Sequence, residues 1–436
     1  MSSNSSISGF TRRGFLSLAG GVAAAAVLVA CSADGGSGGG SGGGNTLKFW
    51  NMPWGTPEFT SLDKEIAEAW KPASGDWKVE KQEIQWANFT QTFSSAVASG
   101  TGPAISSGGG TQAFLFESQG KITYADALIE KWKSNGLYDD FLPGLFDAMK
   151  VEGGYAAIPY NLDMRVMWMN KALLEKAGAD VPTDWDSYMA AAEKLKAIGV
   201  YAFGVGAGAG SFTGSHILAS FMFNNGGGLF NDAHEPELVT DRNIEAMEFV
   251  IEMAKKGYID PGTVSYTSDN VQAQWRERTF GLGWDGAGLA ANVGGDVQAE
   301  LEVVSPLTGP NGDKGAIYFP NNIMMYTDSP DQAATEDFAT YYYQNMAPLW
   351  KQHTGIGLPP LKSIAETPEF REDPNAVKII EEWQPIAQTW GGKSLFLDVT
   401  KVDGTPAMNN FTQSIYSGAT DAKTALESLQ SALEAA

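Results

Sequence analysis

The stretch Gly153–Gly178, GGYAAIPYNLDMRVMWMNKALLEKAG, combines three local patterns within the length of one strand and one helix. Its apolar start ends at Pro159, and because proline donates no hydrogen bond to a sheet, we expect the chain to turn there. A half-buried strand follows, in which apolar and polar side chains alternate. Lys171–Ala177 then predicts a short helix that ends at Gly178.

The polar side chains of this strand include Asn161, Asp163 and Arg165, which interrupt an otherwise apolar segment. Because successive side chains of a strand point to opposite faces, one face is expected to lie in a core and the other to carry chemistry. We therefore predict that these three residues bind a ligand.

Length and composition restrict the class of protein. A chain of 436 residues suits two domains better than one core, and 43% hydrophobic residues with 13 tryptophans can fill both. The formal net charge of −22 argues against nucleic acid as a partner, because its binding needs Lys and Arg to neutralise phosphates. With three histidines and one cysteine in the chain, no metal-ligand cluster, no disulfide and no cofactor is expected.

The N-terminus is expected to be an export signal. Thr11–Leu16 is close to the twin-arginine pattern, and the apolar run that follows is too short for a retained membrane span. Leu28–Cys31 resembles a bacterial lipobox, so residues 1–30 are predicted to be the signal peptide and Cys31 to be lipidated. Residues 31–44 then form a Gly/Ser tether. The export route, twin-arginine or general secretory, stays open.

Two predicted strand-to-helix loops carry candidate ligand contacts, because ligands of open α/β sheets bind at the carboxyl ends of strands. Trp54 follows the strand 47–50, where it is either a sugar platform or a hydrophobic staple for the next helix. The loop 106–112, SSGGGTQ, offers Thr111 and Gln112 for hydrogen bonds. It lacks the Gly-Lys-Ser/Thr ending of a phosphate loop, so nucleotide binding is not expected.

Two later segments add further candidates. Phe280–Gly288, FGLGWDGAG, places Trp284 and Asp285 at the end of a strand, and small neighbours are expected to leave the indole face open for a sugar ring. The alternative is a core tryptophan. Phe212 is a possible pocket residue, as is His216, although a lone histidine is more often an ordinary buried residue.

The paired amides Asn321 and Asn322 are expected at the start of a strand, either at the edge of a ligand pocket or in a turn. Segments 301–306 and 355–360 contain the prolines and glycines expected where backbone absorbs a hinge rotation.

Several stretches in one order resemble the bacterial extracellular solute-binding proteins, family 1, the carbohydrate-binding lipoproteins of ABC importers. Gly153–Gly178 resembles the crossing between their lobes, and Gly100–Ile105 resembles a family signature, with Ala104 in place of the usual Asp. Phe280–Gly288 is a shortened form of another family block without its Ala-Met.

The resemblance implies an α/β fold of the two-lobe, type II periplasmic-binding-protein kind, with three hinge crossings and the ligand cleft between the lobes. The lobes are expected to comprise residues 45–158 with 306–352, and 159–305 with 353–436.

The implied function is that of an anchored, extracytoplasmic monomer that captures a sugar and delivers it to an ABC permease without turning it over. The alternatives are a membrane-anchored glycoside hydrolase, in which Asp163 and Asp285 would be the two carboxylates, and a solute-binding protein for a non-sugar ligand. The sugar, its linkage and the permease are not specified by the sequence.

Overall fold

The computed structural model describes residues 45–86, 89–392 and 395–436. The predicted signal peptide, Cys31 and the Gly/Ser tether lie outside these residues. Within the described ranges, no helix is both long enough and apolar enough to cross a lipid bilayer.

A nine-stranded mixed sheet runs through the molecule in the order β2–β1–β3–β10–β7–β8. Off this path, β4 and β11 pair with β10, and β9 pairs with β7. The bounds of these strands are β1 Asn45–Asn51, β2 Trp77–Glu83, β3 Ile105–Gly108, β4 Ile122–Thr123, β7 Ile158–Asn170, β8 Leu282–Gly286, β9 Leu301–Val303, β10 Ala316–Tyr326 and β11 Ala387–Gln388. A separate hairpin pairs β5 (Lys150–Val151) with β6 (Gly154–Tyr155).

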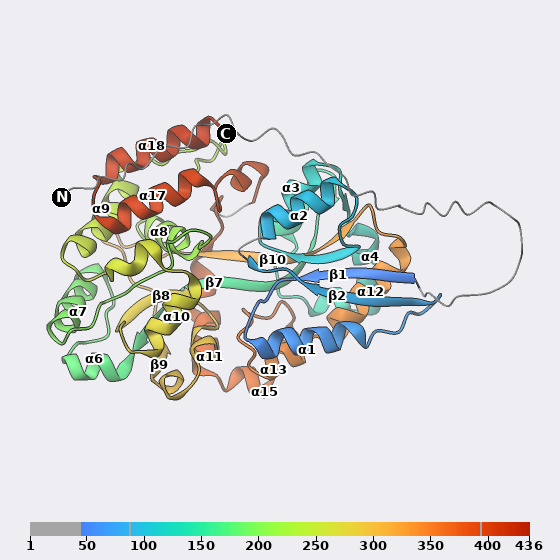
Figure 1. Cartoon of the computed structure of the whole chain (residues 1–436), viewed down its shortest axis with the longest axis horizontal. Helices are drawn as coiled ribbons and strands as arrows, with labels where there is room; N and C mark the ends of the chain where they lie inside the picture. The colour runs from blue at the N-terminus through green and yellow to red at the C-terminus, as the bar shows by residue number, and fades with distance from the viewer. Residues whose placement is uncertain (1–44, 87–88, 393–394) are drawn as a thin grey trace, which may run out of the picture. The chain divides into compact units, whose positions relative to one another are not determined.

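The first lobe is built on both faces of β1, which pairs in parallel with β2 and β3. Phe49 lies in a core cluster on one face and Trp50 in a second cluster on the other, as the two-residue period of a strand requires. Figure 1 shows α2 and α3 on one side of these strands and α1 with α12 on the other. The helices are α1 Pro57–Glu68, α2 Phe89–Ala98, α3 Gln112–Ser118, α4 Asp126–Asn135, α5 Leu137–Asp140, α12 Gln332–Asn345, α13 Pro348–Lys351 and α14 Lys362–Ala365.

The second lobe surrounds a third cluster, centred on Trp168 and Trp275, with helices on both sides of β7 and β8. The chain enters the second lobe through α6. The side chain of Asn170 caps the start of this helix and Gly178 ends it, so the predicted helix Lys171–Ala177 is confirmed. Its helices are α6 Lys171–Ala177, α7 Trp185–Ala197, α8 Thr213–Asn224, α9 Asp241–Lys255, α10 Ser268–Arg276, α11 Leu289–Val293, α15 Pro368–Arg371, α16 Pro374–Lys378, α17 Pro406–Ser417 and α18 Ala422–Glu434.

Two long antiparallel strands, β7 and β10, pass from one core to the other (Figure 1). Their register shifts between Asn321 and Asn322, which face Asn161 and Pro159, so Tyr160 is an extra residue on β7. The expected turn at Pro159 is therefore wrong: the strand continues through it. A bulge tolerates a residue that cannot donate to the ladder, which explains a proline inside a strand of 13 residues.

The expected strand start at Asn321 and Asn322 is also wrong, because β10 begins at Ala316. Its first half pairs with β7 from Met164 to Leu162, and this pairing places the two amides in the middle of the strand. They are consequently buried between the lobes rather than in a turn.

A third connection runs beside these strands. The backbones of Leu162 and Leu358 exchange hydrogen bonds of 3.0 and 2.8 Å. Gly355, three residues before Leu358, is approached closely by the second lobe. A Cβ placed on Gly288 of that lobe would lie 2.2 Å from the carbonyl oxygen of Gly355. Such close approach requires glycine at position 288 and brings the second lobe against the crossing backbone.

Near the connections, no single residue marks the boundary between the side chains of the first core and those of the second. Leu307 and Phe319 pack in the second core, whereas Ile356 and Ile364 pack in the first. The residue numbers given above for the two lobes remain a prediction.

Candidate functional site

Trp54 lies where β1 ends, as the strand-to-helix argument predicts. Its indole N–H donates to Oδ1 of Asn51 at 2.8 Å and to Oγ of Ser107, near the end of β3, at 3.0 Å. The ring is half-buried. The ring also packs against both core clusters of the first lobe, so it offers a ligand only the part of its apolar surface that these cores leave uncovered.

Trp54 begins a row of aromatic rings, the aromatic row, formed by Trp54, Trp86, Phe89 and Phe212. Successive ring centroids are 4.7, 5.5 and 6.2 Å apart, each pair edge to face. All four residues are half-buried. Since Phe89 starts α2 of the first lobe and Phe212 precedes α8 of the second, the row passes from one lobe to the other.

Four amides, the amide group, lie in two pairs where the long strands meet the first lobe: Asn161 with Asn321, and Gln112 with Asn322. The Nδ2 of Asn321 donates to Oδ1 of Asn161 at 3.0 Å across β7 and β10. A Cβ on Gly108 would lie 3.0 Å from Oε1 of Gln112 and 3.1 Å from Oδ1 of Asn322. The predicted residues therefore form two pairs, Asn161 with Asn321 and Gln112 with Asn322, on opposite faces of β10.

Several atoms of the amide group are buried without a hydrogen-bond partner among the described residues. They are Oε1 of Gln112, Nδ2 of Asn161, and both Oδ1 and Nδ2 of Asn322. An unsatisfied buried polar atom costs about 1 to 3 kcal/mol. Groups that both donate and accept, such as the hydroxyls of a sugar, match this mixed set.

A charged cluster, formed by Asp163, Arg165, His216 and Asp403, lies farther along β7. The Nη1 of Arg165 donates to Asp163, and its Nη2 lies 3.1 Å from Nδ1 of His216. The Nε2 of His216 lies 3.1 Å from Oδ1 of Asp403. Because a guanidinium only donates, Nδ1 of His216 must accept and Nε2 must carry the proton, which fixes a neutral tautomer.

Phe319 and Trp390 enclose this cluster. The guanidinium of Arg165 lies 5.4 Å from the centre of the Phe319 ring, and the rings of His216 and Phe319 are 4.4 Å apart. The Trp390 ring is 5.6 Å from His216. Burial lowers the pKa of His216, with Asp403 opposing the shift.

Asp285, at the end of β8, lies near the cluster and is half-buried. Removal from water raises the pKa of its carboxyl to about 6, partly opposed by the backbone N–H of Gly286 and by the charge of Arg165. Arg165 donates directly to Asp163 and not to Asp285. The two carboxylates are therefore in different electrostatic environments.

The expected open face of Trp284 is wrong. Its side chain is 6% exposed, and its ring is 5.3, 5.7 and 4.6 Å from those of Tyr188, Phe203 and Phe221. In the pairing of β7 with β8, Trp284 lies on the face that also carries Arg165. At this end of the face, however, Tyr188 of α7 and Phe221 of α8 cover the indole. The neighbouring Gly283 leaves room for Trp275 and Phe203.

The remaining predicted residues lie at the same junction. Thr111 precedes α3 and its side chain makes no cap hydrogen bond, while Phe212 belongs to the aromatic row. Sequence reasoning missed Trp86, Ser107, Phe319, Trp390 and Asp403, and it left His216 aside. Trp86 had a usable signal, because it follows the end of β2 as Trp54 follows β1.

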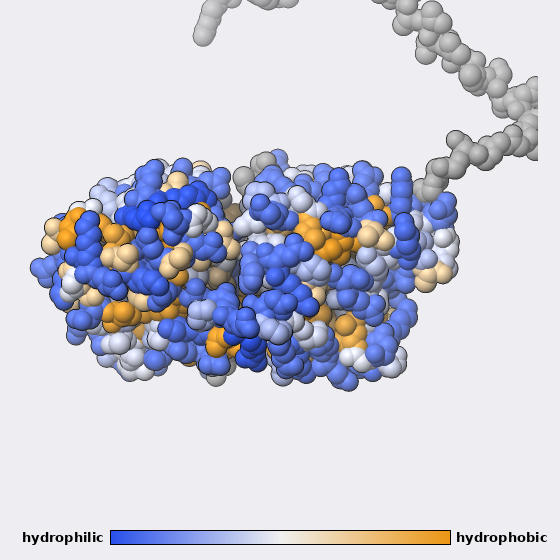
Figure 2. Space-filling view, turned by 90° about the horizontal axis from the view of Figure 1, so that it is seen from below, coloured by the Kyte–Doolittle hydropathy of each residue, from blue (hydrophilic) through white to orange (hydrophobic). Residues whose placement is uncertain are grey.

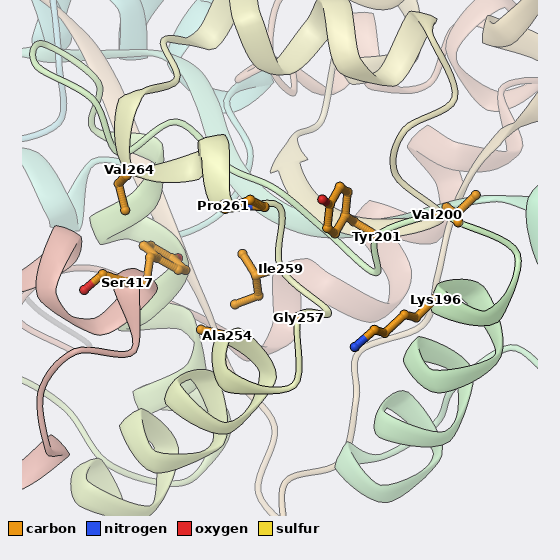
Figure 3. A pocket seen from close by; sticks show the side chains of 11 residues that line it. Lys196, Val200, Tyr201, Ala254, Gly257, Ile259, Pro261, Val264 and Ser417 are labelled. Atoms are coloured by element: carbon orange, nitrogen blue, oxygen red, sulfur yellow. The ribbon is translucent and has the colours of Figure 1, made fainter.

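A different cavity of about 580 Å³ opens on the second lobe (Figure 3). Ile259 and Pro261 lie in the middle of its lining, with Lys196 and Ser417 on opposite sides. None of its lining residues belongs to the aromatic row, the amide group or the charged cluster.

A recess lies between the two halves of the molecule, as Figure 2 shows. Among the described residues, no group of three or more His, Cys, Asp and Glu side chains is arranged to hold a metal ion.

Comparison with known proteins identifies relatives of the whole architecture. Residues 53–347 match the family model described as bacterial extracellular solute-binding protein. A binding protein of Brucella abortus (strain 2308) is 22% identical over 284 residues, which cover 64% of this chain and 68% of that protein.

Solved structures extend the match to the fold. A sugar transporter from Arthrobacter chlorophenolicus A6 with bound laminaribiose is 48% identical, covers 90% of this chain and 99% of its own, and superposes with a TM-score of 0.86. A maltose-bound protein of T. maritima shares 16% identity with a TM-score of 0.76, covering 89% of this chain and 99% of its own. These likenesses confirm the predicted α/β two-lobe, type II periplasmic-binding-protein fold.

Proposed function

The chain belongs to the bacterial extracellular solute-binding proteins, and from this membership we propose that it captures a short, uncharged oligosaccharide outside the cytoplasm and delivers it to the permease of an ABC importer. Laminaribiose, bound by the relative that is 48% identical, is the first candidate ligand. The family match agrees with the class of function predicted from the sequence.

The observation that carries the proposal is the aromatic row beside the amide group at the junction of the lobes. Aromatic faces suit the apolar C–H surfaces of sugar rings, while amides donate to and accept from hydroxyls. Trp54 supplies the aromatic surface, and the unpartnered amide atoms of Asn161 and Asn322 supply the polar groups, within the fold of a binding protein.

The charges favour a neutral ligand. Arg165 is the cation at the centre of the charged cluster, and Asp163 pairs with it. Asp285 and Asp403 add further negative charge nearby. A carboxylated or phosphorylated sugar would meet repulsion from these carboxylates, whereas neutral hydroxyls can donate to them.

Capture follows from the two-lobe geometry. Ligand contacts from both lobes favour the closed arrangement over the open one, because a ligand shifts an equilibrium by its difference in affinity for the two states. The strands β7 and β10 and the segment around Leu358 connect the lobes, so closure is a rotation about them. The permease would recognise the closed form.

Binding without turnover is part of the proposal. A glycosidase needs one carboxyl group as a proton donor and a second free carboxylate, about 5 to 10 Å away. Asp285 has the raised pKa of a proton donor. Asp163, however, is ion-paired with Arg165 and is therefore not the free carboxylate that a glycosidase needs as its nucleophile or base. The site therefore suits a binding protein.

The location of the protein is proposed from its N-terminal sequence. Cleavage before Cys31 and lipidation of its thiol would anchor the folded part to the outer face of the cytoplasmic membrane through the Gly/Ser tether. We further propose that the folded part acts as a monomer.

Calorimetric titration tests the sugar proposal, with laminaribiose, other neutral disaccharides and a uronic-acid disaccharide as ligands. We expect saturable one-to-one binding of at least one neutral sugar and none of the acidic one. Trp54→Ala should weaken binding, and Trp77→Ala is its matched control, because Trp77 is also half-buried but lies at the opposite end of the β1–β2 pair. Absence of binding to every sugar would reject the proposal.

Chromatography of the sugar after prolonged incubation with the protein tests the absence of turnover. The oligosaccharide should be recovered unchanged. Product that forms steadily with the native protein and not with Asp285→Asn would show a hydrolase instead.

A further inference from the structure

A charged network lies behind the aromatic row, out of reach of any ligand. Asp63 on α1 is completely buried. Its Oδ1 accepts from the hydroxyl of Tyr342 at 2.6 Å, and its Oδ2 accepts from Nδ2 of Asn51 at 2.9 Å. The same oxygen lies 3.2 Å from Nζ of Lys81, whose side chain is 2% exposed.

This network fixes the orientation of one amide. Because a carboxylate accepts and an ammonium donates, Asn51 must turn its NH₂ group toward Asp63. Its Oδ1 then faces the opposite way, where it accepts from the Trp54 indole at 2.8 Å and from the Ser107 hydroxyl at 2.5 Å. The indole also donates to Oγ of Ser107 at 3.0 Å.

Stability alone gives no reason for a charge at this position. A buried ion pair loses its hydration, and replacing such a pair by apolar side chains is often neutral or stabilising. Burial is also the largest influence on the pKa of Asp63, and it raises that pKa. The neighbouring positions of α1 that face inward, Phe59, Ile66 and Ala67, are apolar.

We propose that Asn51 is a positioning residue for ligand binding, anchored by Asp63, and that it holds the indole of Trp54, directly and through Ser107, in the orientation that the sugar meets. The inference rests on the proposed function, because it assigns to Trp54 a ligand contact. Asn51 and Ser107 are both fully buried, so they act on the ligand only through the half-buried indole.

Asn51→Leu tests this role, since leucine has the same branching at Cγ and removes the hydrogen bonds of Asn51 to Asp63, Trp54 and Ser107. Loss of a net hydrogen bond corresponds to an affinity change of about 2- to 10-fold, so we expect the dissociation constant for the sugar to rise within that range. In a Trp54→Phe background, which has no indole N–H to hold, the same substitution should change affinity by less than about twofold. This non-additivity separates positioning from a general loss of stability.

Ser107→Ala and Ser106→Ala form a matched pair on β3. Both serines are completely buried, but Ser106 pairs with the hydroxyl of Tyr326 at 2.9 Å instead of with Asn51. Ser107→Ala should weaken sugar binding and Ser106→Ala should not, although both lower the melting temperature. This pair keeps the test available if Asn51→Leu does not fold.

The outcomes distinguish the two proposals. If the native protein binds no sugar, the proposed function fails. If it binds sugar and Asn51→Leu leaves the affinity unchanged, or if Ser106→Ala and Ser107→Ala lower it equally, the positioning role fails while the function stands.

Discussion

The guanidinium of Arg165 and the imidazole of His216 meet at 3.1 Å, with Nη2 facing Nδ1. This contact exists only while Nδ1 is unprotonated, since a protonated imidazole would present a second donor to the arginine. The groups that face His216 are Arg165, Asp163 and Asp403. The protonation state of one buried ring is therefore connected to the strand that carries the predicted ligand contacts.

We predict that acid weakens both folding and sugar binding through His216. Its pKa in the folded protein is lowered by burial, so the stabilising neutral form is fully present above the unfolded pKa of about 6.5 and is lost as pH falls through the lower folded value. Melting temperature and affinity measured from pH 7.5 down to 4.5 should both fall.

His216→Gln is the variant that isolates this effect, because glutamine can accept from Arg165 and donate to Asp403 without titrating. The melting temperature and the sugar affinity of this variant should fall less between pH 7.5 and 4.5 than those of the native protein. His353→Asn is the control, since His353 is exposed and has a positive φ of 51° that asparagine tolerates. An equal fall in His216→Gln would contradict the prediction.

We predict the opposite pH dependence for Asp285. The folded pKa is raised to about 6, so its contribution to stability is present below the unfolded pKa of 3.8 and is lost as pH rises through about 6. Asp285→Asn should therefore raise the free energy of unfolding at pH 7.5 by about 1 to 2 kcal/mol, a value reduced because the group is only half-buried. At pH 4 the gain should disappear.

Denaturant titration at the two pH values measures this difference. Asp163→Asn provides the contrast: it removes the partner of a buried arginine and should lower stability by about 3 to 5 kcal/mol at pH 7.5. Equal effects of the two substitutions would mean that Asp163 and Asp285 share one environment, against the hydrogen bonding of Arg165.

We predict that Trp284→Ala lowers the free energy of unfolding by about 3 to 5 kcal/mol, the usual cost of emptying a tryptophan site in a core. Any loss of sugar affinity should follow from unfolding rather than from a lost contact. Chemical denaturation and calorimetry on the same sample measure the two quantities.

We predict that Trp54→Ala weakens sugar binding more than it lowers the free energy of unfolding, the reverse of Trp284→Ala. A lost aromatic platform weakens binding by about 1 to 3 kcal/mol, whereas the half-buried ring contributes less to the core than Trp284 does. If Trp54→Ala binds sugar like the native protein, the aromatic row is not the ligand surface.

We predict that Cys31 is lipidated, on the pattern Leu28–Cys31 and the tether that follows it. Intact mass of the protein from the membrane fraction should show cleavage before Cys31 and added acyl chains. Cys31→Ser should appear in the soluble fraction with unchanged sugar affinity. An unmodified thiol on mature, membrane-free native protein would contradict the prediction.

The sequence was sufficient for the fold class, whereas the location of the ligand site along the chain stays a prediction. The strand that carries Asn161, Asp163 and Arg165 and the loop that carries Trp54 were predicted from local patterns. The expected half-buried alternation of that strand is wrong, because β7 lies between the lobes and is buried on both faces. The order of several weak motifs supplied the architecture, which the comparisons support.

The rest depended on contacts between distant segments. Alternation shows on which face of a strand Trp284 lies, but not that α7 and α8 cover that part of the face. Asp403 is 187 residues from His216 in the chain, and no local signal links them. The continuation of β7 through Pro159 required the partner strand, because only pairing reveals a bulge.

The bulge at Tyr160 also restricts how this chain can change in length. Side chains of a strand alternate, so the extra residue reverses, on β7 alone, which face each later side chain takes relative to β10. Deleting one residue between Tyr160 and Arg165 would move the predicted ligand contacts Asp163 and Arg165 to the opposite face of β7 in one step. Insertions and deletions in this segment are thus confined to pairs of residues, whereas the surface loops of both lobes can vary one residue at a time.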